Sequence, residues 1–199
     1  MPKIDAATVA EHRANQEDAL LAAARELLLN GGRGAVTPAA VGAAAGLARS
    51  SVYKYFRSGE EILERIVGNA FEDWATVVRD AVDAVDGADQ RIAAYVRTSL
   101  ALAGSGAHQI AVLGGGVPQD DRARERIALA HSGLAAPLCE ALTELGDPDP
   151  ALTAELIDGA IGRAIDRLDT GADFRHIHTL TLTFVRRAVG IGGTEPAPG

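Results

Sequence analysis

The chain has 199 residues and a formal net charge of -8, with 47% hydrophobic and 4% aromatic residues. Abundant alanine and leucine, without long alternating runs of β-branched residues, predict an all-α protein with a sizeable core. The single cysteine, Cys139, excludes an internal disulfide, and the absence of apolar runs of signal-peptide or membrane-spanning length predicts a cytoplasmic protein without a membrane partner.

The first expected helix covers residues 12–30, where leucines and alanines recur at helical spacing before Gly31 and Gly32. Thr37 is a suitable N-cap for a short helix that starts at Pro38. Gly46 permits a turn with positive φ, and a second short helix begins almost at once. Two short helices joined by a tight glycine turn predict a helix-turn-helix.

Charge is distributed unevenly along the sequence. Residues 1–60 hold seven Lys/Arg and six Asp/Glu, whereas residues 61–199 hold twelve and twenty-one. No acidic residue lies between Glu26 and Glu60, but four basic residues do: Arg33, Arg49, Lys54 and Arg57. Helical spacing directs Ala48, Val52, Tyr55 and Phe56 to the core and leaves cations and hydroxyls exposed. Such a surface suits phosphate oxygens and base edges.

The remaining elements are also expected to be helices. Ser58 and Glu61 form a capping box before a long helix with an apolar stripe, which continues towards Gly87. Further helices are expected at residues 89–102, around Ile110, from Pro118 towards Leu145, at residues 150–168 and after Asp173. Asp149 and Asp173 are the expected N-caps of the last two helices.

Residues 12–67 resemble the DNA-binding domain of the TetR family of bacterial transcription regulators. The matching positions are Thr37, Ala45, Gly46, Leu47, Val52, Tyr53, Tyr55, Phe56, Glu60 and Glu61. Ala48 stands where the family often has a serine that caps the recognition helix. The resemblance implies an all-helical homodimer with about nine helices per subunit. It also implies a helix-turn-helix domain at residues 1–57, a helical effector-binding and dimerisation domain at residues 58–191, and a flexible tail at residues 192–199.

The function implied is that of a regulator, by family habit a repressor, which binds an inverted-repeat DNA operator and is released by a small apolar effector. The expected DNA-contacting residues are Thr37, Arg49, Ser50, Ser51, Tyr53, Lys54, Tyr55 and Arg57. Arg49 either reads a guanine or touches only the backbone. A surface helix that happens to lack acidic residues is the competing interpretation of this segment.

Two further sets of residues are expected in the helical domain. The candidate effector site comprises Phe71, Trp74, Val78, Tyr95, His108, Leu113, His131 and Leu138, with Cys139 as a polar possibility. For Phe71 and Trp74 a core position is an equal alternative, and for each histidine a surface or hydrogen-bonded role is favoured. The candidate dimer interface comprises Ile157, Ile161, Ile165, Leu168, Ile177, Leu180 and Phe184, although the same stripes also fit an intramolecular core.

No pattern in the sequence indicates an enzyme, a cofactor or a metal site. His176 and His178 are two residues apart, which places them on different faces of a helix. The glycines at 114–116 follow no expected strand, so a phosphate-binding loop is not expected. Two alternatives remain: a helical sensor or enzyme domain that has lost DNA binding, and a scaffold that works only by pairing subunits.

Overall fold

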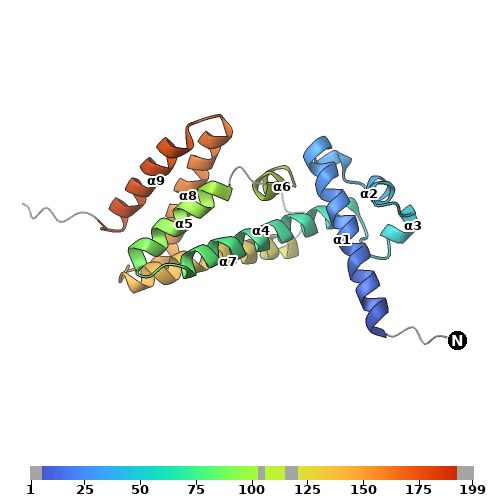
Figure 1. Ribbon diagram of the computed structural model, residues 1–199, viewed down its shortest axis with the longest axis horizontal. Coiled ribbons are helices and arrows are strands. Elements are labelled where there is room, and N and C mark those ends of the chain that lie inside the picture. The colour runs from blue at the N-terminus through green and yellow to red at the C-terminus, as the bar shows by residue number, and fades with distance from the viewer. Residues whose placement is uncertain (1–5, 103–105, 115–120, 192–199) are drawn as a thin grey trace, which may run out of the picture. The chain divides into compact units, whose positions relative to one another are not determined.

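The computed structural model describes residues 6–102, 106–114 and 121–191, and in this part of the chain every regular element is a helix (Figure 1). The all-α fold is therefore confirmed. None of the described helices combines the length and apolarity that a membrane span requires. The helices are α1 (Ala6–Gly31), α2 (Pro38–Ala44), α3 (Arg49–Val52), α4 (Gly59–Asp83), α5 (Ala88–Leu102), α6 (Gly106–Gly114), α7 (Asp121–Glu144), α8 (Pro150–Asp169) and α9 (Phe174–Ala188), with a 3₁₀ turn, η1, at Arg33–Ala35.

Three helix starts follow the expected capping chemistry. The side chain of Thr37 accepts a hydrogen bond from the amide of Ala40 at 3.2 Å. Asp149 and Asp173 accept from amides three residues later, at 3.1 and 2.8 Å. These N-caps are confirmed, because each satisfies a donor that the first helical turn leaves unpaired.

The capping box expected at α4 differs in one bond. Ser58 Oγ accepts from the amide of Glu61 at 3.2 Å, as expected. The Glu61 carboxylate, however, accepts from the amide of Arg57 at 2.6 Å rather than from that of Ser58. Glu61 therefore also fixes the connection that leads from α3 into α4.

Among the described residues, the boundaries of two helices differ by several residues from the sequence expectation. α1 begins at Ala6, ahead of the expected start at residue 12, and α4 ends at Asp83, before Gly87. Gly87 has a φ of 82° and turns the chain into α5. The expected start of the seventh helix at Pro118 and the expected tail at residues 192–199 lie outside the described residues.

The chain divides into two compact units. The first contains residues 1–70 with 109–123, and the second contains residues 71–108 with 124–199. The sequence places a boundary at Ser58, which lies inside the first unit. The reason is packing: Ile62 and Ile66 on the first turns of α4 are fully buried and do not belong to the hydrophobic cluster of the second unit.

The core of the second unit is one hydrophobic cluster built from α4, α5, α7, α8 and α9. Its largest fully buried side chains include Tyr95, Ile92, Leu100, Leu138 and Leu142. Arg186 on α9 binds Asp89 at the start of α5 through two contacts of 2.8 and 3.0 Å. The unit is therefore held by apolar burial and by an ion pair between distant segments.

Candidate nucleic-acid interface

The helix-turn-helix depends on two glycines. Gly46 has a φ of 68° and supplies the turn between α2 and α3. Gly42 permits the close approach of the two helices, because a Cβ at that position would lie 2.9 Å from Cγ2 of Val52 and 3.0 Å from the carbonyl oxygen of Leu47. Val41 and Val52, both fully buried, fix α2 and α3 to the core of the first unit.

The recognition helix is a single turn, Arg49–Val52, extended by turn hydrogen bonds from the amides of Lys54, Tyr55 and Phe56. Val52 and Phe56 are buried, as expected. Ala48 and Tyr55 were expected on the same core side, but Ala48 is exposed and Tyr55 is half-buried. The expectation from helical spacing is wrong for these two residues because both lie outside the helix. Ala48 is an extended N-cap without a side-chain hydrogen bond, and Tyr55 follows the end of the helix at Val52.

The outer side of this segment carries most of the expected DNA-contacting residues. Those exposed are Thr37, Arg49, Ser50, Tyr53, Lys54 and Arg57, whereas Ser51 is half-buried. Arg49 donates from Nη2 to the hydroxyl of Tyr53 at 3.0 Å, and its guanidinium carbon lies 5.5 Å from the centre of the Tyr53 ring. This contact holds the Arg49 guanidinium against the exposed Tyr53 side chain.

Tyr55 makes a contact that the sequence analysis did not foresee. Its hydroxyl, expected to reach phosphate, donates to Oε1 of Gln16 on α1 at 2.6 Å. The guanidinium carbon of Arg13, also on α1, lies 5.6 Å from the centre of the Tyr55 ring. Residues 13 and 16 are about forty positions away from Tyr55 along the chain, so no local pattern indicates this pairing.

Arg33 differs from the other cations of the acid-free segment. Its guanidinium binds the carboxylate of Glu60 on α4 and the carbonyl oxygen of Gly114, the last residue of α6. A Cβ on Gly114 would lie 2.6 Å from Cγ2 of Val67 and 3.2 Å from Cδ2 of Leu28. Arg33 therefore holds the C-terminal end of α6 within the first unit and is not part of a free cationic surface.

The residues of the candidate dimer interface separate into two groups. Ile157, Ile161 and Ile165 are 2%, 4% and 5% exposed and lie in the hydrophobic cluster of their own unit. Leu168 and Ile177 pack against that cluster. These five were expected to face a partner, but their side chains are turned to the intramolecular core, which was the alternative interpretation of the stripe.

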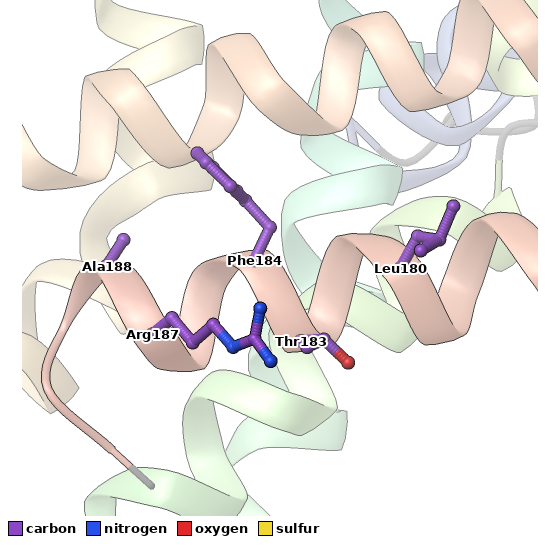
Figure 2. Close-up of a pocket in the computed structure, with 5 residues that line it drawn as sticks. All are labelled: Leu180, Thr183, Phe184, Arg187 and Ala188. Carbon is purple, nitrogen blue, oxygen red and sulfur yellow. The ribbon is translucent and has the colours of Figure 1, made fainter. Parts of the chain in front are cut away.

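Leu180 and Phe184 are the members of this set that face outwards, at 54% and 56% exposed. They line a shallow hollow on α9 together with Thr183, Arg187 and Ala188, and Figure 2 shows Leu180, Phe184 and Ala188 on one side of the helix. On α8, Leu152 and Leu156 are also exposed, at 51% and 67%. The sequence analysis missed these two leucines, although their spacing of four residues places them on one helix face.

Four of the candidate effector-site residues come together in the cluster of the second unit: Trp74, Val78, Tyr95 and Leu138. His108 meets the Trp74 ring edge-on at a centroid distance of 5.9 Å and contacts Asp169 at 3.2 Å. Phe71 is half-buried and Leu113 is 41% exposed. The side chain of His131 lies outside the described residues.

Among the described residues of this unit, the buried side-chain atoms without a hydrogen-bond partner include Nε1 of Trp74 and Oγ of Ser99. Because buried polar groups are nearly always hydrogen-bonded, these atoms are candidate contacts for a bound polar group. Ser99 does not stand out in the sequence, where it is an ordinary serine within a helix.

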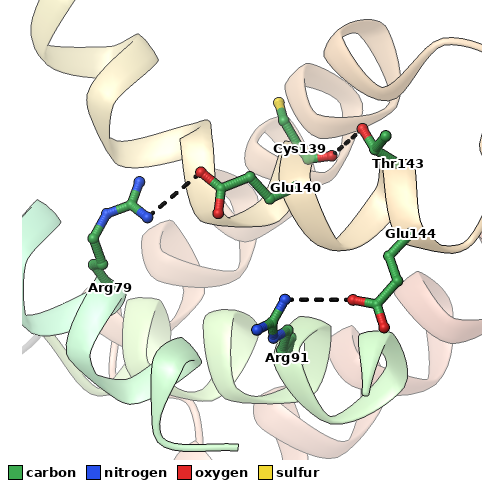
Figure 3. Close-up of polar contacts among 6 residues, drawn as sticks. All are labelled: Arg79, Arg91, Cys139, Glu140, Thr143 and Glu144. Carbon is green, nitrogen blue, oxygen red and sulfur yellow. Dashed lines mark hydrogen bonds and ion pairs between the residues drawn. The ribbon is translucent and has the colours of Figure 1, made fainter. Parts of the chain in front are cut away.

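Cys139 lies on α7 beside two ion pairs that join this helix to its neighbours (Figure 3). Arg79 on α4 contacts Glu140 at 3.5 Å, and Arg91 on α5 contacts Glu144 at 3.3 Å. The half-buried thiol of Cys139 donates to the carbonyl oxygen of Pro150 at 3.7 Å. Burial, followed by the negative charge of Asp158, raises the pKa of Cys139.

A helix-turn-helix with an exposed cationic turn, joined to a second helical unit, defines a class of protein: the DNA-binding transcriptional regulators. The sequence model for bacterial regulatory proteins of the tetR family matches residues 20–66. Residues 20–66 therefore carry the DNA-binding domain of tetR-family regulatory proteins. No curated protein sequence matches it.

Solved structures share the fold over most of the chain. The fatty acid degradation regulator FadR from Bacillus halodurans is 17% identical, has a TM-score of 0.70 and covers 92% of this chain and 97% of its own. FadR from Bacillus subtilis, solved in complex with stearoyl-CoA, is 20% identical with a TM-score of 0.69, over 84% and 96%. SmeT, the repressor of the Stenotrophomonas maltophilia multidrug efflux pump SmeDEF, is 18% identical with a TM-score of 0.65, over 92% and 96%.

Proposed function

We propose that this regulator binds an inverted-repeat operator as a homodimer and that a small apolar effector releases it. The observation that carries the proposal is the exposed turn from Arg49 to Lys54. Neither cation forms an ion pair with a carboxylate within the part of the chain that the structure describes. A polyanion therefore meets two free positive charges on a protein whose net charge is -8.

The individual roles follow from geometry. Lys54 is a phosphate anchor, and Arg49 presents its fork of donors to a guanine edge or to the backbone. Ser50 and Tyr53 offer hydroxyls beside them, and the Thr37 side chain lies at the start of α2. Arg57 supplies a further charge just before α4. The proposed contact set differs from the sequence expectation at Tyr55, whose hydroxyl is bound to Gln16.

The proposed dimer uses the outward faces of α8 and α9. Leu152, Leu156, Leu180 and Phe184 are large apolar side chains that are each more than half exposed. Gly159 and Gly162, also on α8, have open space where a Cβ would lie, so a partner helix meets no obstruction there. A second copy of the chain buries this surface symmetrically. Two recognition helices related by a two-fold axis read an inverted repeat.

The proposed effector site is the second unit, around Trp74 and Ser99, whose unpaired polar atoms suit a ligand with a polar group on an apolar body. The complex of Bacillus subtilis FadR with stearoyl-CoA supports an acyl-CoA as the effector of this chain. The similarity to the SmeT repressor supports a repressor rather than an activator. Release requires that the effector bind more tightly to the chain that has left DNA than to the bound chain.

The experiment is a selection of bound duplexes from genomic fragments with the full-length chain. An inverted repeat among the recovered duplexes is expected. The double variant Arg49→Ala with Lys54→Ala should abolish binding to the recovered duplex and keep its helical circular dichroism. Arg97→Ala, an exposed cation on α5, is the matched control and should bind normally. A double variant that still binds would exclude this surface as the DNA-contacting face.

The effector is tested with stearoyl-CoA as the first probe. Trp74 is the only tryptophan of the chain and lies in the cluster of the second unit, so its fluorescence reports binding there. A saturable change in emission together with weaker operator binding is expected. Emission that stays constant up to saturating probe excludes acyl-CoA as the effector class.

A further inference from the structure

α1 places a cation next to the recognition segment. The helix starts at Ala6, and residues 10–15 on its first turns are exposed. Arg13 lies in this stretch, and its guanidinium carbon is 5.6 Å from the centre of the Tyr55 ring. An exposed arginine on the first helix thus reaches the segment that follows α3.

The Tyr55 ring beneath Arg13 is fixed by two contacts of its own. Tyr55 donates its hydroxyl to Oε1 of Gln16, one helical turn after Arg13, at 2.6 Å. The Tyr55 ring also packs beside buried Phe56, with ring centres 6.5 Å apart and tilted by 38°. The aromatic surface under Arg13 is therefore anchored both to α1 and to the core.

The guanidinium is free to bind an anion. Arg13 forms no ion pair within the described residues, and Glu17, the acid one turn later on α1, contacts Arg65 on α4 at 3.3 Å. A guanidinium that lies over an aromatic ring keeps the N–H groups of its edge for other acceptors. Their fork geometry matches the oxygens of a phosphate.

The same arrangement of an arginine over a tyrosine ring occurs at α3 and the residue that follows it. Arg49 lies over the Tyr53 ring at 5.5 Å, and Arg13 lies over the Tyr55 ring at 5.6 Å. The two tyrosines flank Lys54 in the sequence, so both arginines stand beside residues adjacent to the proposed phosphate anchor.

We infer that Arg13 is a DNA-phosphate contact supplied by α1, held over Tyr55 so that it extends the interface of α3. This inference rests on the proposed DNA-binding function. In the competing role, Arg13 only packs on Tyr55 and supports the fold, without touching DNA.

Salt dependence separates the two roles, because each phosphate that a protein neutralises makes the slope of log K against log salt concentration more negative by about 0.9. Binding of the recovered operator duplex is measured by fluorescence anisotropy over a salt series. Arg13→Ala should make the slope less negative by about 0.9 for each bound chain, and therefore by about 1.8 for a dimer. Arg13→Lys should keep the wild-type slope, because the charge remains.

Arg97→Ala removes one charge from the second unit and should leave the slope unchanged, whereas Lys54→Ala should make it less negative. A slope for Arg13→Ala equal to that of the wild type would overturn the inference, even if affinity fell uniformly. If the slope for Arg13→Lys were as weakly negative as the slope for Arg13→Ala, the inference would be overturned as well. If the wild-type chain binds no duplex selectively, the proposed function itself fails before any variant is compared.

Discussion

Tyr95 combines deep burial with a polar partner. It is 1% exposed and donates its hydroxyl to Asp158 at 2.7 Å. Burial, reinforced by the negative charge of Asp158, raises the pKa of Tyr95 far above its ordinary value. The phenol therefore stays protonated and remains a hydrogen-bond donor throughout the pH range in which proteins are handled.

Tyr95→Phe removes this donor and leaves the carboxylate of Asp158 with one partner fewer. Hydrogen bonds to charged groups contribute about 1.5–3 kcal/mol, and a decrease of that size in the free energy of unfolding is expected. Urea unfolding followed by Trp74 fluorescence measures it. Tyr53→Phe, at a 45% exposed tyrosine, is the matched control and should unfold like the wild type. Equal unfolding midpoints for Tyr95→Phe and Tyr53→Phe would contradict this view of Tyr95.

Cys139 should react slowly with alkylating reagents. Thiolate is the reactive form, and a raised pKa lowers the thiolate fraction at neutral pH. Alkylation by iodoacetamide, measured by mass spectrometry, should therefore be slower in the folded chain than in urea, and its rate should rise as pH increases. Asp158→Asn removes the neighbouring charge without removing an acceptor, so it should accelerate the reaction. Identical rates for this variant and the wild type would show that steric shielding alone protects the thiol.

The end of α6 is held by a contact that crosses 81 positions of sequence. Arg33, at the turn after α1, binds the carbonyl oxygen of Gly114 and the carboxylate of Glu60. A cation at the C-terminus of a helix interacts favourably with the helix dipole, by about 0.3–1 kcal/mol. The ion pair with Glu60 is partly exposed, so its own contribution is small.

Arg33→Ala should therefore loosen α6 without unfolding the first unit. Amide hydrogen exchange in residues 109–114 should become about two- to fivefold faster, which corresponds to the loss of 0.3–1 kcal/mol in local stability. Exchange in α8 serves as the internal reference, and Arg57→Ala is the control variant that removes another charge of the first unit. Unchanged exchange in α6 would mean that packing of Gly114 on Val67 and Leu28 is sufficient to hold it.

Local patterns in the sequence predicted the helices but not the contacts between them. Caps such as Thr37 and Asp149 depend on neighbours within four residues, so the sequence reveals them. The first turns of α1 were missed because residues 6–11 hold no large apolar residues repeated at helical spacing. The pairing of Arg13 with Tyr55 arises only when the chain folds. An apolar stripe such as Ile157–Ile165 shows that a helix face is buried, but not which surface covers it.

The proposed dimer links the outward faces of α8 and α9 to the reading of DNA. Each chain carries a single recognition turn of four residues, Arg49–Val52, which is too short to select a long site. Two copies related by symmetry double the base contacts and set the spacing of the half-sites. Dimer formation and operator selectivity should therefore be lost together.

Leu156→Glu and Phe184→Glu each place a charge in the proposed apolar interface, where an unpaired charge is costly to bury. Sedimentation should show the 20.6 kDa chain for both variants and twice that mass for the wild type. Leu145→Glu, at a leucine that is 39% exposed outside these two helices, should keep the wild-type mass. Because the α3 surface is untouched, the two interface variants should retain weak, salt-sensitive binding to random duplex and lose preference for the inverted repeat. The link between this surface and operator selectivity would be disproved if the variants sedimented as dimers. It would also be disproved if monomeric variants still preferred the inverted repeat.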